Sequence, residues 1–501
     1  MATESLSLLR CVIRRCKGLI EEGGCHAALL PLAARSLEHW FKVGKAGLRS
    51  IWPALASRGR GARPALCYAA YNVILALLFP LVALAFLWLG IVVGRIRPGL
   101  LQRLGMTPAR LSTGRPRGQK SLWFHAVSVG EVVASAPIIK RVYGSTSLPL
   151  VASVTTATGR EVAESRLSGL LAGISYFPFD FPLPVESVLD ALDPACLVLI
   201  EGEIWPNLLS LANARGTKII IVNGRISDGA FRVALLFRPL FKWALSNVHA
   251  LYMQSATDLE RMVKLGASRE RAFLGGNVKF DELDAPAVAR HSRADFGLRP
   301  EDLVILAGST HEGEDEQVLD AYWRVRAYAP EARLLVAPRH LERVGNLEQL
   351  ILSKGFTCVR RSQLSSAAKG TLGEGSPVIL VDTMGELASL YSLCNVAFIG
   401  GSLVRKGGQN VLQPLAHGKP VLFGPHMENF RQIGRSAVEA GVGFQVENST
   451  QLADRILSLW NDEPLRERIS EAAGDFISTN RGASDACADA ILRLTQPEAN
   501  T

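Results

Sequence analysis

The sequence predicts an α/β protein in which two Rossmann-like αβα domains face each other across a cleft, preceded by an N-terminal membrane-anchor helix. Three observations support this prediction. Two series of short apolar segments alternate with helical patterns, and one long segment near the N-terminus carries no charge. The chain also has 501 residues, more than the roughly 250–300 residues at which a single hydrophobic core stops growing.

Composition narrows the class of protein. Hydrophobic residues make up 48% and charged residues 20% of the chain, which excludes a disordered or collagen-like protein. The 8 cysteines are scattered without a CxxC pair, so we expect a reducing compartment rather than disulfides or a zinc module. The net charge of +9 comes without basic runs interleaved with aromatics, so an anionic membrane or substrate explains it better than nucleic acid.

Residues 64–95 are the predicted membrane anchor. No charged residue occurs from Ala65 to Gly94, and about 20 apolar residues suffice to span a bilayer as a helix. Few buried core helices stay uncharged over such a length, so membrane insertion, spanning or monotopic, is the stronger interpretation. Arginines flank both ends of the segment, so the positive-inside rule assigns no orientation.

Residues 1–63 form a basic N-terminal extension with eleven Lys or Arg and four Glu. Two interpretations stay open: an organellar presequence, which would place the protein on an organellar membrane, or a basic amphipathic helix on a membrane surface. A cleaved secretory signal is not expected, because the long apolar segment begins too far into the chain.

The first α/β series lies in a domain predicted over residues 96–285. Its short, β-branched apolar runs are typical of buried parallel strands, and segments with helical spacing follow them. The expected strands are 121–127, 148–156, 174–180, 195–203, 217–224, 250–256 and 272–276.

A second series follows in a domain predicted over residues 286–501. Residues 281–300 are polar and contain two prolines, which is typical of an interdomain linker. In open α/β sheets ligands bind at the carboxyl ends of the strands, so the candidate site residues are those that follow strands. The expected strands are 302–310, 332–340, 377–383, 396–402, 419–425 and 441–446.

Carboxylates follow two strands of the first series. Glu131 comes just after Gly130, which permits a tight turn into the next helix, and it lies in the first helical turn facing the predicted cleft. Its alternative role is to complement the helix dipole. Glu201 and Glu203 follow a buried strand, where ionised groups are costly unless they are paired or used. Arg225, after the next strand, is the candidate partner, and pairing is compatible with a catalytic role.

Lys279 ends the first series as a cation suited to a leaving phosphate or a developing negative charge, with a solvated linker lysine as the alternative. In the second series five polar or glycine-rich turns follow strands, which favours a phosphate- or nucleotide-binding domain. The motifs of dinucleotide-binding, P-loop, zinc-protease and nucleophile-elbow enzymes do not occur. The turns are Ser309-Thr310, Arg339-His340, residues 382–387, Gly400-Gly401 and residues 407–414.

Long segments in this order resemble successive blocks of the 3-deoxy-D-manno-octulosonic acid (Kdo) transferase family. The resemblance runs from about Leu66 to about Phe430, and the apolar N-terminal segment is where this family attaches to membranes. The segments are FHAVSVGEVVASAPII, EGEIWPNLL, VNGRIS, GNVKFD, GSTHEGEDE, APRHLER, DTMGELASLY, FIGGSLV and GGQNVLQPLAHGKPVLFGPHMENF.

The resemblance implies a GT-B fold and an inverting glycosyltransferase. The first domain would bind the tetraacyl lipid A precursor, lipid IVA, and the second the donor CMP-Kdo. Glu131 matches the catalytic base, and Glu201 and Lys279 match positions that stabilise the transition state. We expect no metal and no cofactor, because CMP is a good leaving group and no DxD-type motif is placed for a metal. The positions that match nucleotide contacts are Arg339, His340, Met384, Gly385, Glu386, Asn410, Val411, Leu412 and Gln413.

Gln413 departs from the family pattern HNxxEP. The usual glutamate would accept hydrogen bonds from both ribose hydroxyls, whereas a glutamine amide offers only its carbonyl oxygen. The loss of one charged hydrogen bond of about 1.5–3 kcal/mol predicts donor binding that is weaker by roughly 10- to 100-fold. Gln413 therefore keeps open a transferase that uses another nucleotide sugar. A non-catalytic membrane-bound relative that holds the lipid or the nucleotide is a separate alternative hypothesis.

The expected location is the bacterial inner membrane, with the catalytic domains on the cytoplasmic face. The expected partners are CMP-Kdo, the lipid A precursor and an anionic membrane, with no nucleic acid and no obligate protein partner. Sequence motifs do not determine how many Kdo residues are transferred.

Overall fold

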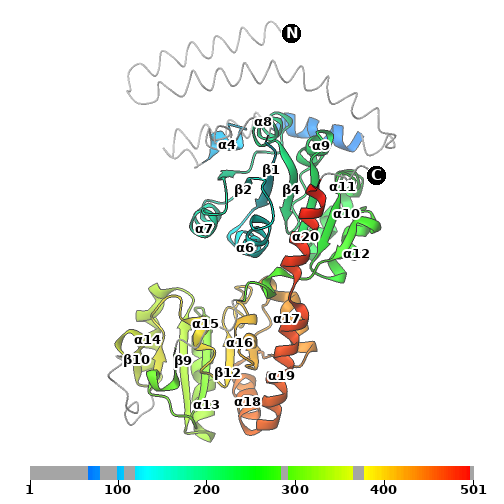
Figure 1. The fold of residues 1–501 in the computed structure, drawn as a ribbon. Coiled ribbons are helices and arrows are strands. Elements are labelled where there is room, and N and C mark those ends of the chain that lie inside the picture. Colours follow the sequence, from blue (N-terminus) through cyan, green and yellow to red (C-terminus); the bar gives the residue numbers. More distant parts are fainter. Residues whose placement is uncertain (1–65, 79–98, 107–118, 284–290, 365–376, 497–501) are drawn as a thin grey trace, which may run out of the picture. The chain divides into compact units, whose positions relative to one another are not determined.

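Two compact units make up the chain in the computed structural model. Unit 1 comprises Met1–Val278 and Ala483–Thr501, and unit 2 comprises Lys279–Gly482. Each unit is an α/β layer structure built on one parallel sheet (Figure 1). The structure describes residues 66–78, 99–106, 119–283, 291–364 and 377–496.

The sheet of unit 1 has seven parallel strands in the order β3-β2-β1-β4-β5-β6-β7. Each of the seven segments predicted from the sequence overlaps one strand. Two buried apolar clusters, one on each face, cover the sheet, as all-parallel sheets require. The strands are β1 (Ser121–Ala126), β2 (Leu150–Val154), β3 (Gly173–Tyr176), β4 (Pro194–Ile200), β5 (Lys218–Gly224), β6 (Ala250–Met253) and β7 (Ala272–Leu274).

Local signals explain where helices of unit 1 begin. Thr156, Ser227 and Ser255 each accept a hydrogen bond from a backbone N–H in the first turn of the helix that follows. Proline lies at the start of three others, where its missing N–H costs nothing. The helices are α4 (Leu100–Arg103), α6 (Val129–Tyr143), α7 (Ala157–Leu167), α8 (Pro182–Leu192), α9 (Pro206–Ala214), α10 (Asp228–Leu236), α11 (Arg238–Leu245), α12 (Ala256–Leu265) and α20 (Ala483–Thr495).

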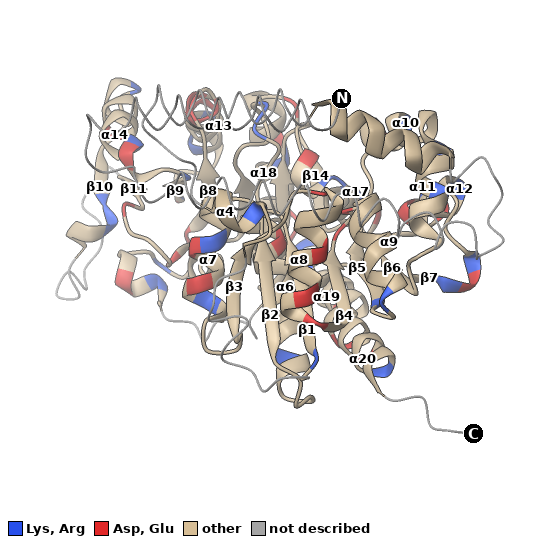
Figure 2. Cartoon of the chain, turned by 90° about the horizontal axis from the view of Figure 1, so that it is seen from above, with Lys and Arg blue, Asp and Glu red and all other residues tan. Residues whose placement is uncertain are grey.

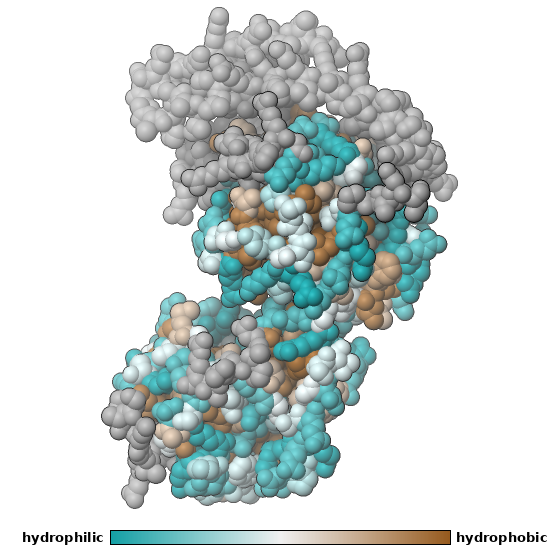
Figure 3. Space-filling model, viewed as in Figure 1, coloured by the Kyte–Doolittle hydropathy of each residue, from teal (hydrophilic) through white to brown (hydrophobic). Residues whose placement is uncertain are grey.

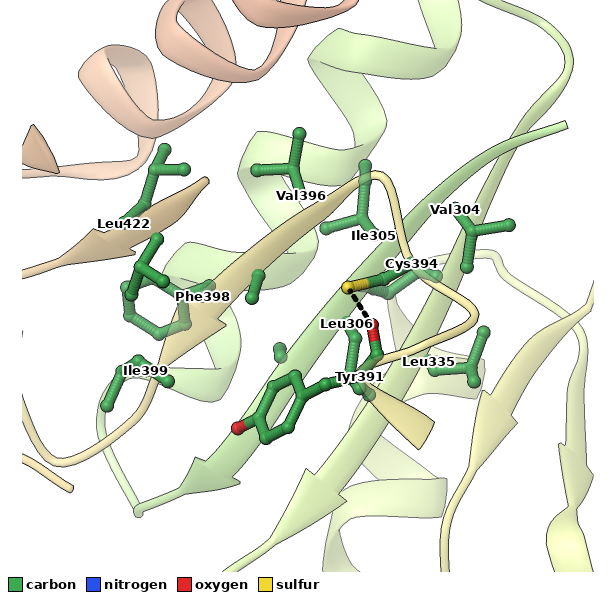
Figure 4. Close-up of a cluster of buried hydrophobic side chains, with 14 of the residues drawn as sticks. Val304, Ile305, Leu306, Leu335, Tyr391, Cys394, Val396, Phe398, Ile399 and Leu422 are labelled. Atoms are coloured by element: carbon green, nitrogen blue, oxygen red, sulfur yellow. Dashed lines mark hydrogen bonds between the residues drawn. The ribbon is translucent and has the colours of Figure 1, made fainter. Parts of the chain in front are cut away.

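Unit 2 repeats this plan with strand order β10-β11-β9-β8-β12-β13-β14. Its core gathers on the central strands, with Val304, Ile305 and Leu306 of β8 close to Val396 and Phe398 of β12 (Figure 4). Six of its strands lie in predicted segments. The strands are β8 (Leu303–Thr310), β9 (Ala332–Pro338), β10 (Cys358–Arg360), β11 (Val378–Leu380), β12 (Val396–Ile399), β13 (Val421–Phe423) and β14 (Gly443–Gln445).

The edge strand β10 is the strand that sequence analysis missed. It has three residues, all only partly buried, and it ends in Arg360. A strand this short shows no periodicity that a sequence pattern can detect. The longer helices of unit 2 are α13 (Asp315–Tyr328), α14 (Val344–Ser353), α17 (Arg431–Glu439), α18 (Ser449–Asn461) and α19 (Glu463–Asn480), with the short helices α15 (Leu387–Leu390) and α16 (Leu412–Ala416) at strand ends.

The division into units differs from the expected domain limits in two places. The first crossing lies between Val278 and Lys279 rather than at residue 285, and the chain returns to unit 1 at Ala483. Helix α20 packs against α6 (Figure 1) and buries Cys487 and Ile491 there. The pattern of a C-terminal amphipathic helix does not indicate which domain covers its apolar face.

The segment expected as a linker, 281–300, is partly integrated into unit 2. Phe296 is completely buried, and the Arg293 guanidinium donates to Leu393 O at 3.1 Å and to Asn395 Oδ1 at 2.8 Å. The polar residues that predicted a linker therefore include Arg293, which forms hydrogen bonds within unit 2. Residues 284–290 lie outside the described part of the chain.

The predicted anchor and the basic extension fall mostly outside the described residues. Among those described, no helix has both the length and the apolar character needed to cross a membrane. Residues 66–78 are helical, and Tyr68 stacks on Trp243 with ring centroids 4.0 Å apart. Five large apolar residues of this helix are exposed: Leu66, Val73, Ile74, Leu77 and Leu78.

The described surface is mixed in character. Acidic and basic residues are interspersed along both units (Figure 2), and hydrophilic residues cover most of the visible described surface, with smaller hydrophobic areas between them (Figure 3). Among the described residues all five cysteines are free.

Asp180 joins the helix of residues 66–78 to α9. Its carboxylate accepts hydrogen bonds from Tyr71 Oη at 2.9 Å and from the backbone N–H groups of Asn207 and Leu208 at 3.0 and 2.8 Å. These two N–H groups lie in the first turn of α9 and would otherwise lack a partner. Burial raises the pKa of Asp180 to about 7, against the effect of the backbone N–H groups.

Replacing Asp180 by alanine should lower the free energy of unfolding by about 2–4 kcal/mol, because two buried backbone donors lose their acceptor. Tyr71→Phe removes only one of the three bonds and should cost about 1 kcal/mol. Urea unfolding of the full chain, followed by tryptophan fluorescence, measures both. The control is Glu164→Ala, which removes an exposed carboxylate paired with Arg160 and should change stability by less than about 0.5 kcal/mol. A midpoint for Asp180→Ala equal to that of the control would contradict this role.

Candidate functional site

Glu131 lies in the first turn of α6, immediately after the carboxyl end of β1. Its Oε2 accepts a hydrogen bond from the backbone N–H of Val127 at 2.6 Å, and its Oε1 lies 3.4 Å from Ser128 Oγ. The side chain is 8% exposed. The carboxylate therefore complements the start of the helix, as one interpretation expected, and keeps a small accessible surface.

Burial raises the pKa of Glu131 to about 7. The Val127 N–H and the charge of Arg225 act in the opposite direction, while the neighbouring carboxylates Glu201 and Glu203 raise the pKa further. A carboxylate with a pKa near neutrality is suited to accept a proton and release it again. Perturbed groups of this kind gather at functional sites.

Glu201 follows β4, and the structure confirms Arg225 as its partner. Arg225 Nε donates to Glu201 Oε2 at 2.5 Å. Glu201 is 7% exposed and has a φ of 67°, a left-handed conformation that is uncommon for a residue with a side chain. Burial also raises the pKa of Glu203. Unit 1 thus brings together three carboxylates and one arginine at the ends of neighbouring strands.

Gly130 is not required for the turn that precedes Glu131. It lies within α6 without a positive φ, and a Cβ atom on it would have only Ser128 Oγ, at 3.9 Å, within reach. The expectation that this glycine permits a tight turn is therefore wrong. The space beside it is open.

Lys279 is the first residue of unit 2 and contacts that unit. Its Nζ lies 3.4 Å from the carbonyl oxygen of Asn429 and 4.3 Å from the ring centroid of Phe430. The preceding Val278 is buried in the core of unit 1. Lys279 is thus positioned by contacts and is more than a solvated linker lysine.

Glu314 organises the turns of unit 2, and sequence analysis assigned it no role. Its buried carboxylate accepts from the backbone N–H groups of His311 at 2.8 Å and Leu403 at 3.3 Å, and also from that of Gly401. The turn after β8 is thereby held to the glycine-rich turn after β12. The only sequence signal was a carboxylate in a polar turn. Two of its three partners, Gly401 and Leu403, lie 87 and 89 residues away.

Ser309 and Thr310 end β8. Ser309 has a φ of 57°, and the carbonyl of Thr310 accepts from the backbone N–H of Arg339 at 3.0 Å and from Arg343 Nη1 at 3.1 Å. No helix begins directly after them, because α13 starts at Asp315. The turn 311–314 therefore separates this strand end from the helix N-terminus that was expected to follow it directly.

Cations surround this turn. The His311 and His340 rings meet edge to face with centroids 5.7 Å apart, and the side chains of Arg339 and His340 are exposed. Burial lowers the pKa of His311, and His340, Arg343, Lys406 and Arg339 lower it further. This edge of unit 2 is consequently suited to an anionic ligand.

In the turn 384–386 one side chain makes contacts within the protein and the other two residues are accessible. Met384 is 84% exposed, and Gly385 has a φ of 82° with open space around it. Glu386 pairs with Arg361 at 3.4 Å and lies 3.3 Å from His291 Nε2. Met384 and Gly385 are therefore more accessible to a nucleotide than the Glu386 carboxylate.

The run 410–413 is accessible at its two ends. Val411 and Leu412 are completely buried, so only their backbone can reach a ligand. Asn410 Oδ1 accepts from the Leu412 N–H at 2.9 Å, and Gln413 is partly exposed in α16. Within the described ranges no group of three or more His, Cys, Asp or Glu residues is arranged to hold a metal ion.

Comparisons with known proteins identify relatives of the chain. A family profile described as 3-deoxy-D-manno-octulosonic-acid transferase (kdotransferase) matches residues 99–282. The chain is 33% identical over 396 residues to the 3-deoxy-D-manno-octulosonic acid transferase of Bordetella pertussis, covering 77% of this chain and 90% of that protein.

Two further similarities are informative. The chain is 36% identical over 368 residues to a bifunctional glycosyltransferase/methyltransferase of Fusobacterium nucleatum; the match covers 73% of this chain, but only 56% of that protein's length. The crystal structure of UDP-GlcNAc 2-epimerase from Neisseria meningitidis bound to UDP-GlcNAc superimposes with a TM-score of 0.51 at 15% identity, covering 75% of this chain and 99% of that chain. This likeness shows the fold, a GT-B-like α/β fold with two parallel sheets.

The raised pKa of Glu131 predicts a pH dependence of stability. Between about pH 4.5 and 7 the folded protein holds a proton on Glu131 that the unfolded chain has released. Unfolding therefore becomes easier as the pH rises through this window, by on the order of 3 kcal/mol in all. Glu131→Gln removes the titrating group, so its unfolding free energy should fall less steeply over the same range.

Urea unfolding at closely spaced pH values, in wild type and Glu131→Gln, measures this difference. The matched control is Glu164→Gln, an exposed carboxylate of α7, which should follow the wild-type curve. Parallel curves for wild type and Glu131→Gln would show that the Glu131 pKa is not raised.

Proposed function

The chain belongs to the 3-deoxy-D-manno-octulosonic acid transferase family, and from that premise we propose that it transfers Kdo from CMP-Kdo to the lipid A precursor lipid IVA with inversion at the anomeric carbon. The observation that supports this most directly is Glu131, a buried carboxylate with a pKa of about 7 at the end of β1. A glycosyltransferase that inverts needs one base of this kind to activate its acceptor.

The proposed reaction is a single displacement. Glu131 takes the proton of an acceptor hydroxyl while the hydroxyl oxygen forms a bond to the anomeric carbon of Kdo. The bond from that carbon to the phosphate oxygen breaks on the opposite face, and CMP leaves with the electron pair. Because CMP is a good leaving group, we propose that no metal ion and no cofactor take part.

The other residues have distinct proposed roles. Glu201, held by Arg225, keeps negative charge beside Glu131 and so maintains its basicity. Lys279 provides a fixed positive charge for the transition state. In unit 2 we assign the donor nucleotide to the polar strand ends described above, at Ser309, Thr310, Arg339, His340, Met384, Gly385, Glu386 and residues 410–413.

We also propose attachment to the bacterial inner membrane through residues 64–95, with both units on the cytoplasmic face. The exposed apolar residues of the helix at 66–78 support this, since a lipid surface would cover them. Tyr68 and Tyr71 fasten this helix to unit 1, so the anchor would hold unit 1 next to the acceptor lipid.

A transferase with a different nucleotide sugar is the second candidate function, and one observation favours it. Gln413 stands where the family has a glutamate, and its amide offers fewer acceptors for ribose hydroxyls. The neighbouring Asn410 already uses its Oδ1 within the protein.

Replacing Glu131 by glutamine should lower transfer by about 10²- to 10⁴-fold, because the base is lost while the shape is kept. The assay uses membranes that contain the full chain, CMP-Kdo generated in situ and lipid IVA. Mass spectrometry of the lipid reports one or more added Kdo units. Glu164→Gln is the control and should keep full activity.

Each outcome of this assay separates the hypotheses. No mass shift with folded wild-type protein would overturn Kdo transfer to lipid IVA and favour a different donor. Transfer that persists at the wild-type rate in Glu131→Gln would overturn the assignment of the base alone.

Gln413→Glu should tighten donor binding by roughly 10- to 100-fold, because a carboxylate accepts charge-assisted hydrogen bonds from both ribose hydroxyls. Calorimetric titration of the full chain with CMP measures the affinity without requiring turnover. An unchanged affinity would show that the ribose is held by other residues.

A further inference from the structure

Unit 2 contains an open hollow in its surface. It has a volume of about 620 Å³ and is lined by Arg405, Lys406, Gly407, His426, Glu428 and Asn429. These residues come from the loops that follow β12 and β13, which are adjacent parallel strands. The hollow therefore lies at the carboxyl ends of the strands, where α/β sheets bind their ligands.

Hydrogen bonds between the two loops give the hollow a defined frame. The backbone N–H of Asn429 donates to Gly407 O at 2.9 Å, and Asn429 Nδ2 lies 3.3 Å from Lys406 O. Gly407 has a φ of 86°, and a Cβ on it would lie 2.4 Å from Asn429 Nδ2. The close approach of the loops thus requires glycine at this position.

Two cations in the hollow have no partner among the residues that the structure describes. Arg405 and Lys406 are exposed, and within the described ranges the structure gives neither side chain a hydrogen bond or an ion pair. The only acidic lining residue, Glu428, lies 3.7 Å from His426 Nδ1. The hollow therefore carries an excess of positive charge.

Lys279 contacts one of the residues that line the hollow. Its Nζ is 3.4 Å from the carbonyl oxygen of Asn429, one of the lining residues. The lining itself carries two cations, on Arg405 and Lys406, and one carboxylate, on Glu428. Such a cluster is suited to an oxyanion, which an arginine can bind with two parallel hydrogen bonds.

We propose that this hollow binds an oxyanion of the nucleotide-sugar donor, with Arg405 and Lys406 as its ligands. The inference rests on the proposed function, because CMP-Kdo carries two such groups, the carboxylate of the sugar acid and the phosphate of CMP. Arg405 and Lys406 would then determine specificity for an acidic sugar or hold the leaving phosphate.

The test measures transfer by the full chain at varied donor concentration, with CMP-Kdo generated in situ. Arg405→Ala and Lys406→Ala should each raise the KM for the donor by about 10- to 100-fold, with kcat changed far less. Arg405→Lys should recover part of the loss. The control is Arg435→Ala in α17, which removes an exposed arginine paired with Glu439 and should leave the donor KM unchanged.

Calorimetric titration with CMP and with free Kdo identifies the oxyanion. If the hollow holds the sugar carboxylate, Arg405→Ala with Lys406→Ala weakens binding of Kdo and leaves CMP binding unchanged. If it holds the phosphate, the double variant weakens CMP binding instead. Either result supports the proposal.

Two results would overturn it. One is a donor KM that stays at the wild-type value in all the variants; the other is a change confined to the KM of the lipid acceptor, whose phosphates would then be the ligand. If the wild-type chain transfers no Kdo, the proposed function fails, and the titrations still decide the role of the hollow. Equal binding of both ligands by wild type and double variant would then count against it.

Discussion

Parallel pairing of every strand is the constraint on which both units depend. A parallel sheet has to be covered on both faces, and in each unit helices and apolar side chains cover the sheet. Side chains that bind ligands or react are therefore restricted to the ends of the strands, because apolar core residues cover both faces of each sheet. Glu131, Glu201 and Arg225 in unit 1, and the loops around Glu314 and Asn429 in unit 2, all follow this restriction.

Buried carboxylates accept hydrogen bonds from backbone N–H groups at the points where strands end and turns or helices begin. Glu131, Asp180 and Glu314 each accept from at least one such group. Glu131 differs from the other two in lying beside two further carboxylates, those of Glu201 and Glu203, which raise its pKa, whereas Glu314 has one such neighbour, Asp315. The same type of hydrogen bond thus stabilises turns at Asp180 and Glu314, and we propose that at Glu131 it also positions a proton acceptor.

Much of the fold follows from the sequence, because buried parallel strands are short apolar runs that are easy to recognise. The edge strand β10 was not predicted, because its three residues show no periodic pattern. Helix α20 was assigned to the second domain, because the pattern of an amphipathic helix does not show which domain covers its apolar face. Glu131, Glu201 and Arg225 could be anticipated from strand ends alone. Glu314 and the hollow at Arg405 could not, since they depend on contacts between loops far apart in the chain.

The return of the chain to unit 1 has a consequence for synthesis on the ribosome. Unit 2 is continuous from Lys279 to Gly482, so it can finish folding as soon as that stretch has emerged. Unit 1 begins first but lacks Cys487, Ala488 and Ile491 of its core until α20 is made. Until then the apolar face of α6 is uncovered, and the growing chain exposes an aggregation-prone surface for most of its translation.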